Sequence, residues 1–113
     1  MNLFDSHAHL ESQRFEQDRQ EVIARARDAG LVGVVSCGSD LATSRAEIAL
    51  AREYEGLYAA VGIHPHQATC AALDESLNER VFAQLVELAA QPEVVAIGEI
   101  GLDYHYDYSP REV

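Results

Sequence analysis

The fold class is visible in residues 94–103, which read Val94-Val95-Ala96-Ile97-Gly98-Glu99-Ile100-Gly101-Leu102-Asp103. The continuous apolar run at the start of this segment is typical of a buried parallel strand. The run ends at Glu99, and the glycines beside it allow backbone or ligand to approach closely. A carboxylate is costly to bury unless it is paired or bound to a metal. Glu99 is therefore predicted to hold an ion or, alternatively, to emerge into solvent at the strand end.

A second informative segment lies near the N-terminus and reads Phe4-Asp5-Ser6-His7-Ala8-His9-Leu10. Side chains two residues apart on an extended segment point the same way, so both imidazoles can reach one ion. Neutral imidazole suits zinc and similar first-row metals. Leu3-Phe4 is predicted to be the buried part of a short strand, with the histidines at its carboxyl end. A surface His-x-His pair without function is the alternative.

Strand-like and helix-like patterns alternate between these two segments. Strands are expected at 3–4, 31–35, 57–63 and 94–99, and helices at 18–29, 40–54 and 74–90. Helix 40–54 is expected to bury one face, formed by Ala42, Ala46, Ala49 and Leu50. Four units with near-continuous apolar strands imply a parallel sheet.

The polar residues recur just after the expected strands, which is the layout of a (β/α)8 barrel. A doubly wound sheet is the alternative, but it usually has a glycine-rich loop after its first strand, and Asp5-Ser6-His7-Ala8-His9 is not one. A complete barrel takes about 250 residues, and this chain has 113. Ser109, Pro110 and Glu112 match a capping box that starts a helix. We therefore expect residues 1–113 to form the N-terminal half of a single TIM-barrel domain, with four parallel strands and three helices.

The charge balance is strongly acidic, with 19 Asp and Glu against 8 basic residues, all of them arginine, and a net charge of -11. Such a balance argues against a broad nucleic-acid-binding face, but not against a phosphodiester held locally by metal ions. No run approaches the ~20 apolar residues of a membrane span. Cys37 and Cys70 match no zinc or redox motif, so free thiols and a cytoplasmic location are expected.

Three segments together resemble the TatD family of metal-dependent hydrolases, in family order and at family-like separations. They are Phe4 to Leu10, Val61-Gly62-Ile63-His64-Pro65-His66, and Ile97-Gly98-Glu99-Ile100-Gly101-Leu102-Asp103-Tyr104. The resemblance covers essentially the whole chain. It implies a (β/α)8 barrel and a divalent-metal-dependent hydrolase that acts on phosphodiester bonds, of deoxyribonuclease type.

The resemblance also implies a site with two divalent ions, Zn, Mg or Mn. His7 and His9 correspond to ligands of one ion, and Glu99 to a carboxylate that bridges both. Related barrels often use a carboxylated lysine as the bridge, but this chain contains no lysine. The family completes its site with two further histidines and an aspartate from the second half of the barrel, which are not among these residues. The 113-residue chain alone is therefore expected to be inactive.

Other residues near these motifs have two interpretations each. His64 is expected either to contact substrate phosphate or to cap the barrel mouth through hydrogen bonds. His66 is expected to be structural, and Asp103 either orients a ligand or is a loop carboxylate. The nearby aromatic residues are expected to pack over the barrel rim or to stack on bases. These are Tyr104, His105, Tyr106 and Tyr108.

Three function hypotheses follow for the protein. The first is a metal-dependent nuclease whose partner is DNA or another phosphodiester. The second is a related barrel hydrolase that cleaves another ester or amide. The third is a non-catalytic, truncated half-barrel. No membrane partner is expected. Half a barrel leaves sheet edges unpaired, so self-association is expected.

Overall fold

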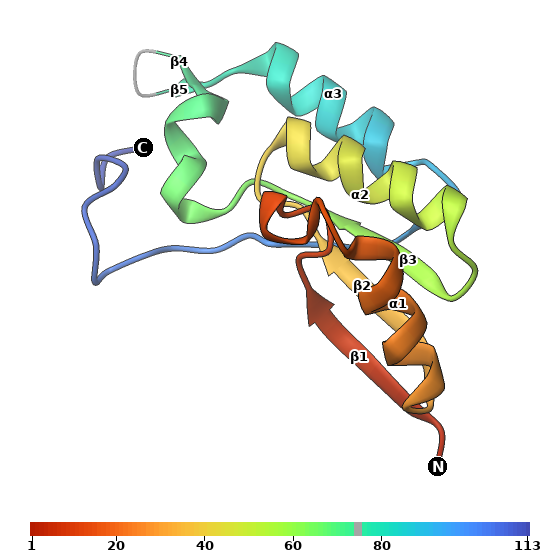
Figure 1. Ribbon diagram of the computed structural model, residues 1–113. Coiled ribbons are helices and arrows are strands. Elements are labelled where there is room, and N and C mark those ends of the chain that lie inside the picture. The colour runs from red at the N-terminus through yellow and green to blue at the C-terminus, as the bar shows by residue number, and fades with distance from the viewer. Residues whose placement is uncertain (74–75) are drawn as a thin grey trace.

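The computed structural model describes residues 1–73 and 76–113, and its central element is one sheet of four parallel strands (Figure 1). The strands are β1 (Leu3–Ala8), β2 (Leu31–Cys37), β3 (Leu57–Val61) and β6 (Val94–Ile97). Their order in space is β1-β2-β3-β6. Each strand thus lies beside its predecessor, as successive strands do in a (β/α)8 barrel.

Helices connect the strands of this sheet. The α-helices are α1 (Arg19–Asp28), α2 (Leu41–Glu53) and α3 (Glu79–Ala89). The short 3-10 helices are η1 (Gln13–Phe15) and η2 (Pro65–Ala71), and two-residue strands β4 (Ala72–Leu73) and β5 (Ser76–Leu77) pair antiparallel. Figure 1 shows the three α-helices along the same side of the sheet.

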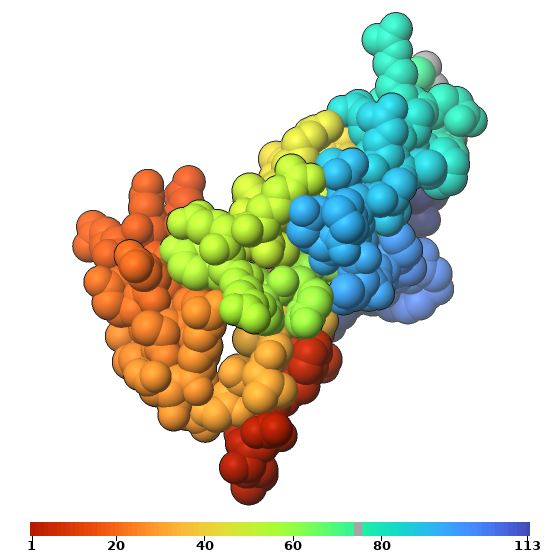
Figure 2. All heavy atoms as spheres, turned by 90° about the vertical axis from the view of Figure 1, so that its right-hand side faces the viewer, coloured from red at the N-terminus to blue at the C-terminus, as the bar shows by residue number. Residues whose placement is uncertain are grey.

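The hydrophobic core lies between these helices and the sheet. Ile48 of α2 packs with Ala59 and Val61 of β3, and all three are buried. Under α1, by contrast, Ile23 is the one buried residue of the helix. A cavity of about 180 Å³ lies between α1 and the strands, and Figure 2 shows this face hollowed beside the orange α1 segment.

Helix α2 begins where a reciprocal cap forms. The Asp40 carboxylate accepts a hydrogen bond of 2.8 Å from the Thr43 amide, and the Thr43 hydroxyl accepts one of 3.0 Å from the Asp40 amide. Such a capping box satisfies two donors that the first turn leaves free. The helix therefore follows the end of β2 after a short, fixed corner formed by residues 38–40.

The predicted fold class is confirmed: the chain is an α/β protein with the strands and helices of the first half of a (β/α)8 barrel. Two of its strands are nevertheless less buried than predicted. Leu3 and Phe4 are exposed, and in β6 so are Val95 and Ile97. These side chains lie on strands at the two edges of the sheet, where the neighbouring strand or layer on one side is missing from the described residues.

The predicted start of the third helix was wrong. Ser76 and Leu77 pair in β5, and α3 begins only at Glu79. The Asn78 side chain accepts hydrogen bonds from the amides of Arg80 and Val81, so it caps the helix there. Residues 74 and 75, the predicted beginning of the helix, lie outside the described residues.

Two further details also differ from prediction. Helix α2 buries Ser44, Glu47 and Ile48, while Ala42 and Ala49 are exposed. Alanine offers little apolar area, so the helix turns its isoleucine to the sheet instead. Residues 110–113 form one turn, in which the Val113 amide donates to the Pro110 carbonyl at 3.1 Å, but the Ser109 hydroxyl donates to the His66 carbonyl at 3.3 Å instead of capping that turn. Among the described residues, no helix is long and apolar enough to cross a membrane.

Candidate metal centre

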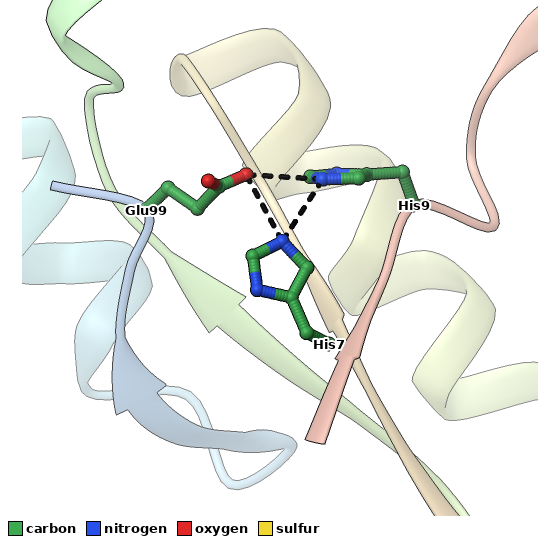
Figure 3. A group of neighbouring side chains, drawn as sticks. All are labelled: His7, His9 and Glu99. Atoms are coloured by element: carbon green, nitrogen blue, oxygen red, sulfur yellow. Dashed lines mark hydrogen bonds and ion pairs between the residues drawn. The ribbon is translucent and has the colours of Figure 1, made fainter. Parts of the chain in front are cut away.

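His7 and His9 come together at the carboxyl end of β1, as predicted. His7 is in the strand and His9 is one residue beyond its end. Their Nε2 atoms lie 3.2 Å apart, and Figure 3 shows both rings directed at one point. The imidazoles are about half exposed, so the point they share is open to solvent.

Glu99 reaches the same point from the segment after β6. Its Oε2 atom lies 3.0 Å from His9 Nε2 and 3.4 Å from His7 Nε2 (Figure 3). Zinc-type ions hold nitrogen and oxygen ligands at about 2.1 Å, which places tetrahedral ligands about 3.4 Å apart and octahedral neighbours about 3.0 Å apart. The three donor atoms are spaced as the ligands of one divalent ion are, so the residues fit a metal.

The orientation of His9 is set by a backbone carbonyl. His9 Nδ1 lies 2.8 Å from the carbonyl oxygen of Cys37, which can only accept a hydrogen bond. The ring proton therefore sits on Nδ1, and Nε2 keeps a free lone pair directed at the centre. The buried Ser36 hydroxyl holds the same segment, because it accepts from the Leu10 amide at 2.8 Å and donates to the Ala8 carbonyl.

The corner after β2 positions three site residues through consecutive carbonyls. Besides the Cys37 carbonyl on His9, the Gly38 carbonyl accepts from the Glu99 amide at 2.9 Å. The Ser39 carbonyl accepts from the amide of His64 at 2.8 Å. This corner therefore aligns the ends of β1, β3 and β6. No sequence pattern indicates this corner, because the hydrogen bonds come from main-chain carbonyls, which every residue carries.

His64 lies at the edge of the centre as a hydrogen-bond donor. Its Nδ1 accepts from the His66 amide at 3.0 Å, so the neutral ring carries its proton on Nε2. That Nε2 lies 3.9 Å from Glu99 Oε1, the carboxylate oxygen that the other two histidines do not share. The contact is too long for a hydrogen bond. The N–H is thus available to an oxygen between the two groups.

Asp103 joins the segment after β6 to η2. Its Oδ2 lies 2.6 Å from His66 Nε2, and Oδ1 accepts from the amides of His105 and Tyr106. These two amides, together with His66, lower the pKa of Asp103 below its ordinary value. Asp103 therefore lies outside the centre and contacts it through His66, whose ring packs against that of His64 with centroids 4.4 Å apart. The aromatic residues beyond it pack on one another, with the rings of Tyr106 and Tyr108 stacked 5.1 Å apart.

A second acidic cluster beside the centre was not predicted. Glu11, Glu47 and His9 each offer a donor atom within 4.8 Å of the others. Glu47 is buried in α2, and desolvation and its contact with Glu11 raise its pKa to about 8. In the sequence, the one indication that Glu47 is buried is its position next to Ile48, on the side of the helix that faces the core.

The other residues singled out from sequence lie apart from the centre or contribute no side chain to it. Cys70 is an exposed free thiol. Cys37 is buried, and burial raises the pKa of its thiol. Its contribution to the centre is therefore the carbonyl oxygen.

The chain is similar to proteins named as metal-dependent hydrolases and nucleases. A family model described as "TatD related DNase" matches residues 4–113. The chain is 42% identical over 112 residues to the 3'-5' ssDNA/RNA exonuclease TatD of Shigella flexneri, covering 97% of this chain and 40% of that protein. It is 40% identical over 111 residues to the uncharacterized metal-dependent hydrolase YabD of Bacillus subtilis, covering 98% of this chain and 41% of that protein.

A solved structure shares the fold. It is the crystal structure of YJJV, a TatD homolog from Escherichia coli K12, with a TM-score of 0.77 and 31% sequence identity. The match covers 93% of this chain and 39% of that one. The chain thus spans about two fifths of the length of these relatives.

Proposed function

Because this chain belongs to the TatD-related DNase family, we propose that it supplies His7, His9 and Glu99 to the metal centre of a hydrolase that cleaves phosphodiester bonds in nucleic acid. The observation that carries the proposal is the common focus of His7 Nε2, His9 Nε2 and Glu99 Oε2, at mutual distances of 3.0 to 3.4 Å. Residues 1–113 would then be the N-terminal half of one barrel domain.

A two-ion centre would suit the shape of Glu99. Its Oε2 is shared with His7 and His9, whereas Oε1 faces the other way, toward His64. One carboxylate can therefore hold two ions, one on each oxygen. Divalent ions at such a site polarise a phosphoryl oxygen and supply hydroxide near neutral pH. The remaining ligands would come from residues beyond these 113, as the family resemblance implies.

His64 would bind the substrate rather than a metal. Its proton is on Nε2, so that atom has no lone pair to offer an ion but can donate to a phosphate oxygen. Asp103 and His66 would keep the ring in this state. A local donor of this kind matters in a chain with a net charge of -11, because its surface as a whole repels a polyanion.

The test is a cleavage assay on the protein with its complete barrel domain, since residues 1–113 alone are expected to be inactive. It uses three substrates: single-stranded DNA, single-stranded RNA, and a simple carboxylic ester. Each is measured with Mn²⁺, Mg²⁺ or Zn²⁺ and again with a chelator. We expect metal-dependent cleavage of a nucleic acid and little of the ester. Cleavage of the ester alone would favour the broader hydrolase function that the name of the Bacillus subtilis relative allows. No cleavage of any substrate would favour the non-catalytic half-barrel.

A further inference from the structure

Glu47 is a buried carboxylate without a hydrogen-bond partner. It is 1% exposed, and neither of its oxygens has a partner among the described residues. An unpaired carboxylate in such a place costs several kcal/mol, on the order of the penalty for any buried ion. The side chain points from α2 toward the segment that follows β1, where Glu11 lies.

Glu11, the neighbour of Glu47, cannot neutralise it, because Glu11 is itself a carboxylate with an unpartnered oxygen. Its Oε2 is also buried without a partner. The nearest basic group on its own segment, Arg19, uses its guanidinium on the backbone carbonyls of Leu10, Glu11 and Ser12. Among the described residues, no ion pair neutralises either carboxylate. Two carboxyl groups therefore share a small volume with no basic group to balance them, and in the metal-free chain the raised pKa of Glu47 means that it keeps a proton in place of a cation.

We propose that Glu11 and Glu47 together bind a divalent cation of the Mg²⁺ or Mn²⁺ class, at a site separate from that of His7, His9 and Glu99. The unpartnered oxygens of Glu47 are directed into the cluster, and two carboxylates match the charge of a divalent ion. Oxygen ligands are those that Mg²⁺ and Mn²⁺ prefer.

Access to this site is from the Glu11 side. Glu11 lines two hollows at the surface, next to η1 and to α2, whereas Glu47 lies behind it. An ion could keep several waters toward these hollows while both carboxylates hold it from within, as Mg²⁺ usually does. His9 borders both sites, but its Nδ1 binds the Cys37 carbonyl and its Nε2 faces the first centre. The second site therefore depends on the two glutamates.

The experiment counts Mn²⁺ ions bound per chain, by equilibrium dialysis and electron paramagnetic resonance after removal of metal with a chelator. It is done in the Glu99→Gln background, so that failure of the first centre does not hide the second. We expect this protein to keep one Mn²⁺, and Glu47→Gln or Glu11→Gln added to it to weaken binding of that ion at least tenfold. Glu87→Gln, an exposed carboxylate on α3 away from both hollows, is the matched control and should change nothing.

Unchanged Mn²⁺ binding in both glutamate variants would overturn the proposal, and so would the absence of any bound Mn²⁺ in the Glu99→Gln protein. The first result would place the ion elsewhere. The second would mean that the pair holds only a shared proton. If Glu47→Gln fails to fold, the Glu11→Gln variant decides alone, because Glu11 is only partly buried.

Discussion

The chemical state of His9 follows from one backbone contact, the hydrogen bond of its Nδ1 to the Cys37 carbonyl. A histidine held in this way offers its other nitrogen to a metal without reorganisation, which strengthens binding. The Glu99 carboxylate is positioned in a similar way, because each of its two oxygens faces a histidine. The side chains of the centre are therefore held in position by contacts with other residues of the same chain.

Glu99→Gln should remove most hydrolytic activity and most metal affinity at the His7–His9 centre while leaving the fold largely intact. The amide keeps the shape of the side chain but loses the negative charge that an ion requires. The measurements are turnover at saturating metal and the thermal unfolding midpoint. Glu87→Gln, an exposed change on α3, serves as control. Near-normal turnover of the Glu99 variant would show that the assignment of this residue is wrong.

The buried Glu47 should make the metal-free protein less stable as the pH rises. Its pKa is raised from 4.5 to about 8 in the folded state. Between these values the folded chain keeps a proton that the unfolded chain has released, so the free energy of unfolding falls with rising pH. The loss is on the order of a few kcal/mol, since one pKa unit is worth about 1.4 kcal/mol.

Denaturant unfolding at a series of pH values from 4 to 9, with a chelator present, measures this effect. Glu47→Gln should flatten the dependence, because the amide does not titrate, whereas Glu53→Gln should preserve it. An equal slope in wild type and in the Glu47 variant would contradict the prediction.

The corner after β2, residues 38–40, determines how the secondary-structure elements align the residues of the centre. A methyl group added at Gly38 would lie 2.7 Å from Ser44 Cα and 2.8 Å from its backbone nitrogen, so the corner or the start of α2 must shift. Gly38→Ala should therefore weaken Mn²⁺ binding at the first centre at least tenfold, through displacement of His9 and Glu99. Isothermal titration calorimetry of the variant would measure it.

Gly33→Ala is the matched control for this change. Gly33 is in the same strand, but its added methyl would meet the exposed ring of Phe4, a side chain that can move aside. Metal affinity should stay close to that of the wild type. A similar loss in both variants would mean that any strain in β2 disturbs the centre, and that the corner has no special role.

The sequence predicted the elements that periodicity determines and missed those that tertiary contacts determine. The four sheet strands and the three α-helices exist in the segments where apolar patterns predicted them, although several of their ends differ, and His7 and His9 meet as their spacing required. The start of α3 was misjudged because Leu77 extends the helical stripe, while Asn78 caps the helix one residue later. Residues 76–77 instead pair with Ala72 and Leu73, and the local hydrophobic pattern does not predict this contact.

The candidate site was predictable to the same extent. Motif residues could be named, but the spacing of their atoms and the carbonyls that orient them could not. The pairing of Glu11 with Glu47 was missed because it depends on which face α2 turns to the sheet. The prediction followed the alanines, whereas the face that packs on β3 carries Ile48 together with the polar Ser44 and Glu47.

At the scale of the whole molecule, the sheet has helices on one side and bare apolar side chains on the other. Phe4 and Tyr58 stack on the uncovered side, and Val95 and Ile97 are about half exposed on the edge strand. Unpaired edges and contiguous apolar surface promote association between chains. We therefore expect residues 1–113 to self-associate in solution.

Sedimentation velocity over a range of concentrations tests this expectation. Val95→Thr, on β6, should shift the distribution toward monomer. Val86→Thr makes the same change on α3 at nearly equal exposure, 52% against 54%, and should not. A wild-type chain that stays monomeric at high concentration would show that the uncovered face of the sheet does not mediate self-association.

The strands of the sheet lie side by side in the order in which they follow along the chain, and this order affects how the protein folds during synthesis. Each strand can dock on the strand before it as soon as it leaves the ribosome, since only one helix-containing connection must close at every step. The proposed metal centre is different, because it joins His7 to Glu99 and so can form only after β6 has arrived. An ion captured there would stabilise the four-stranded sheet and none of its shorter intermediates, which makes metal uptake a marker that β6 has docked.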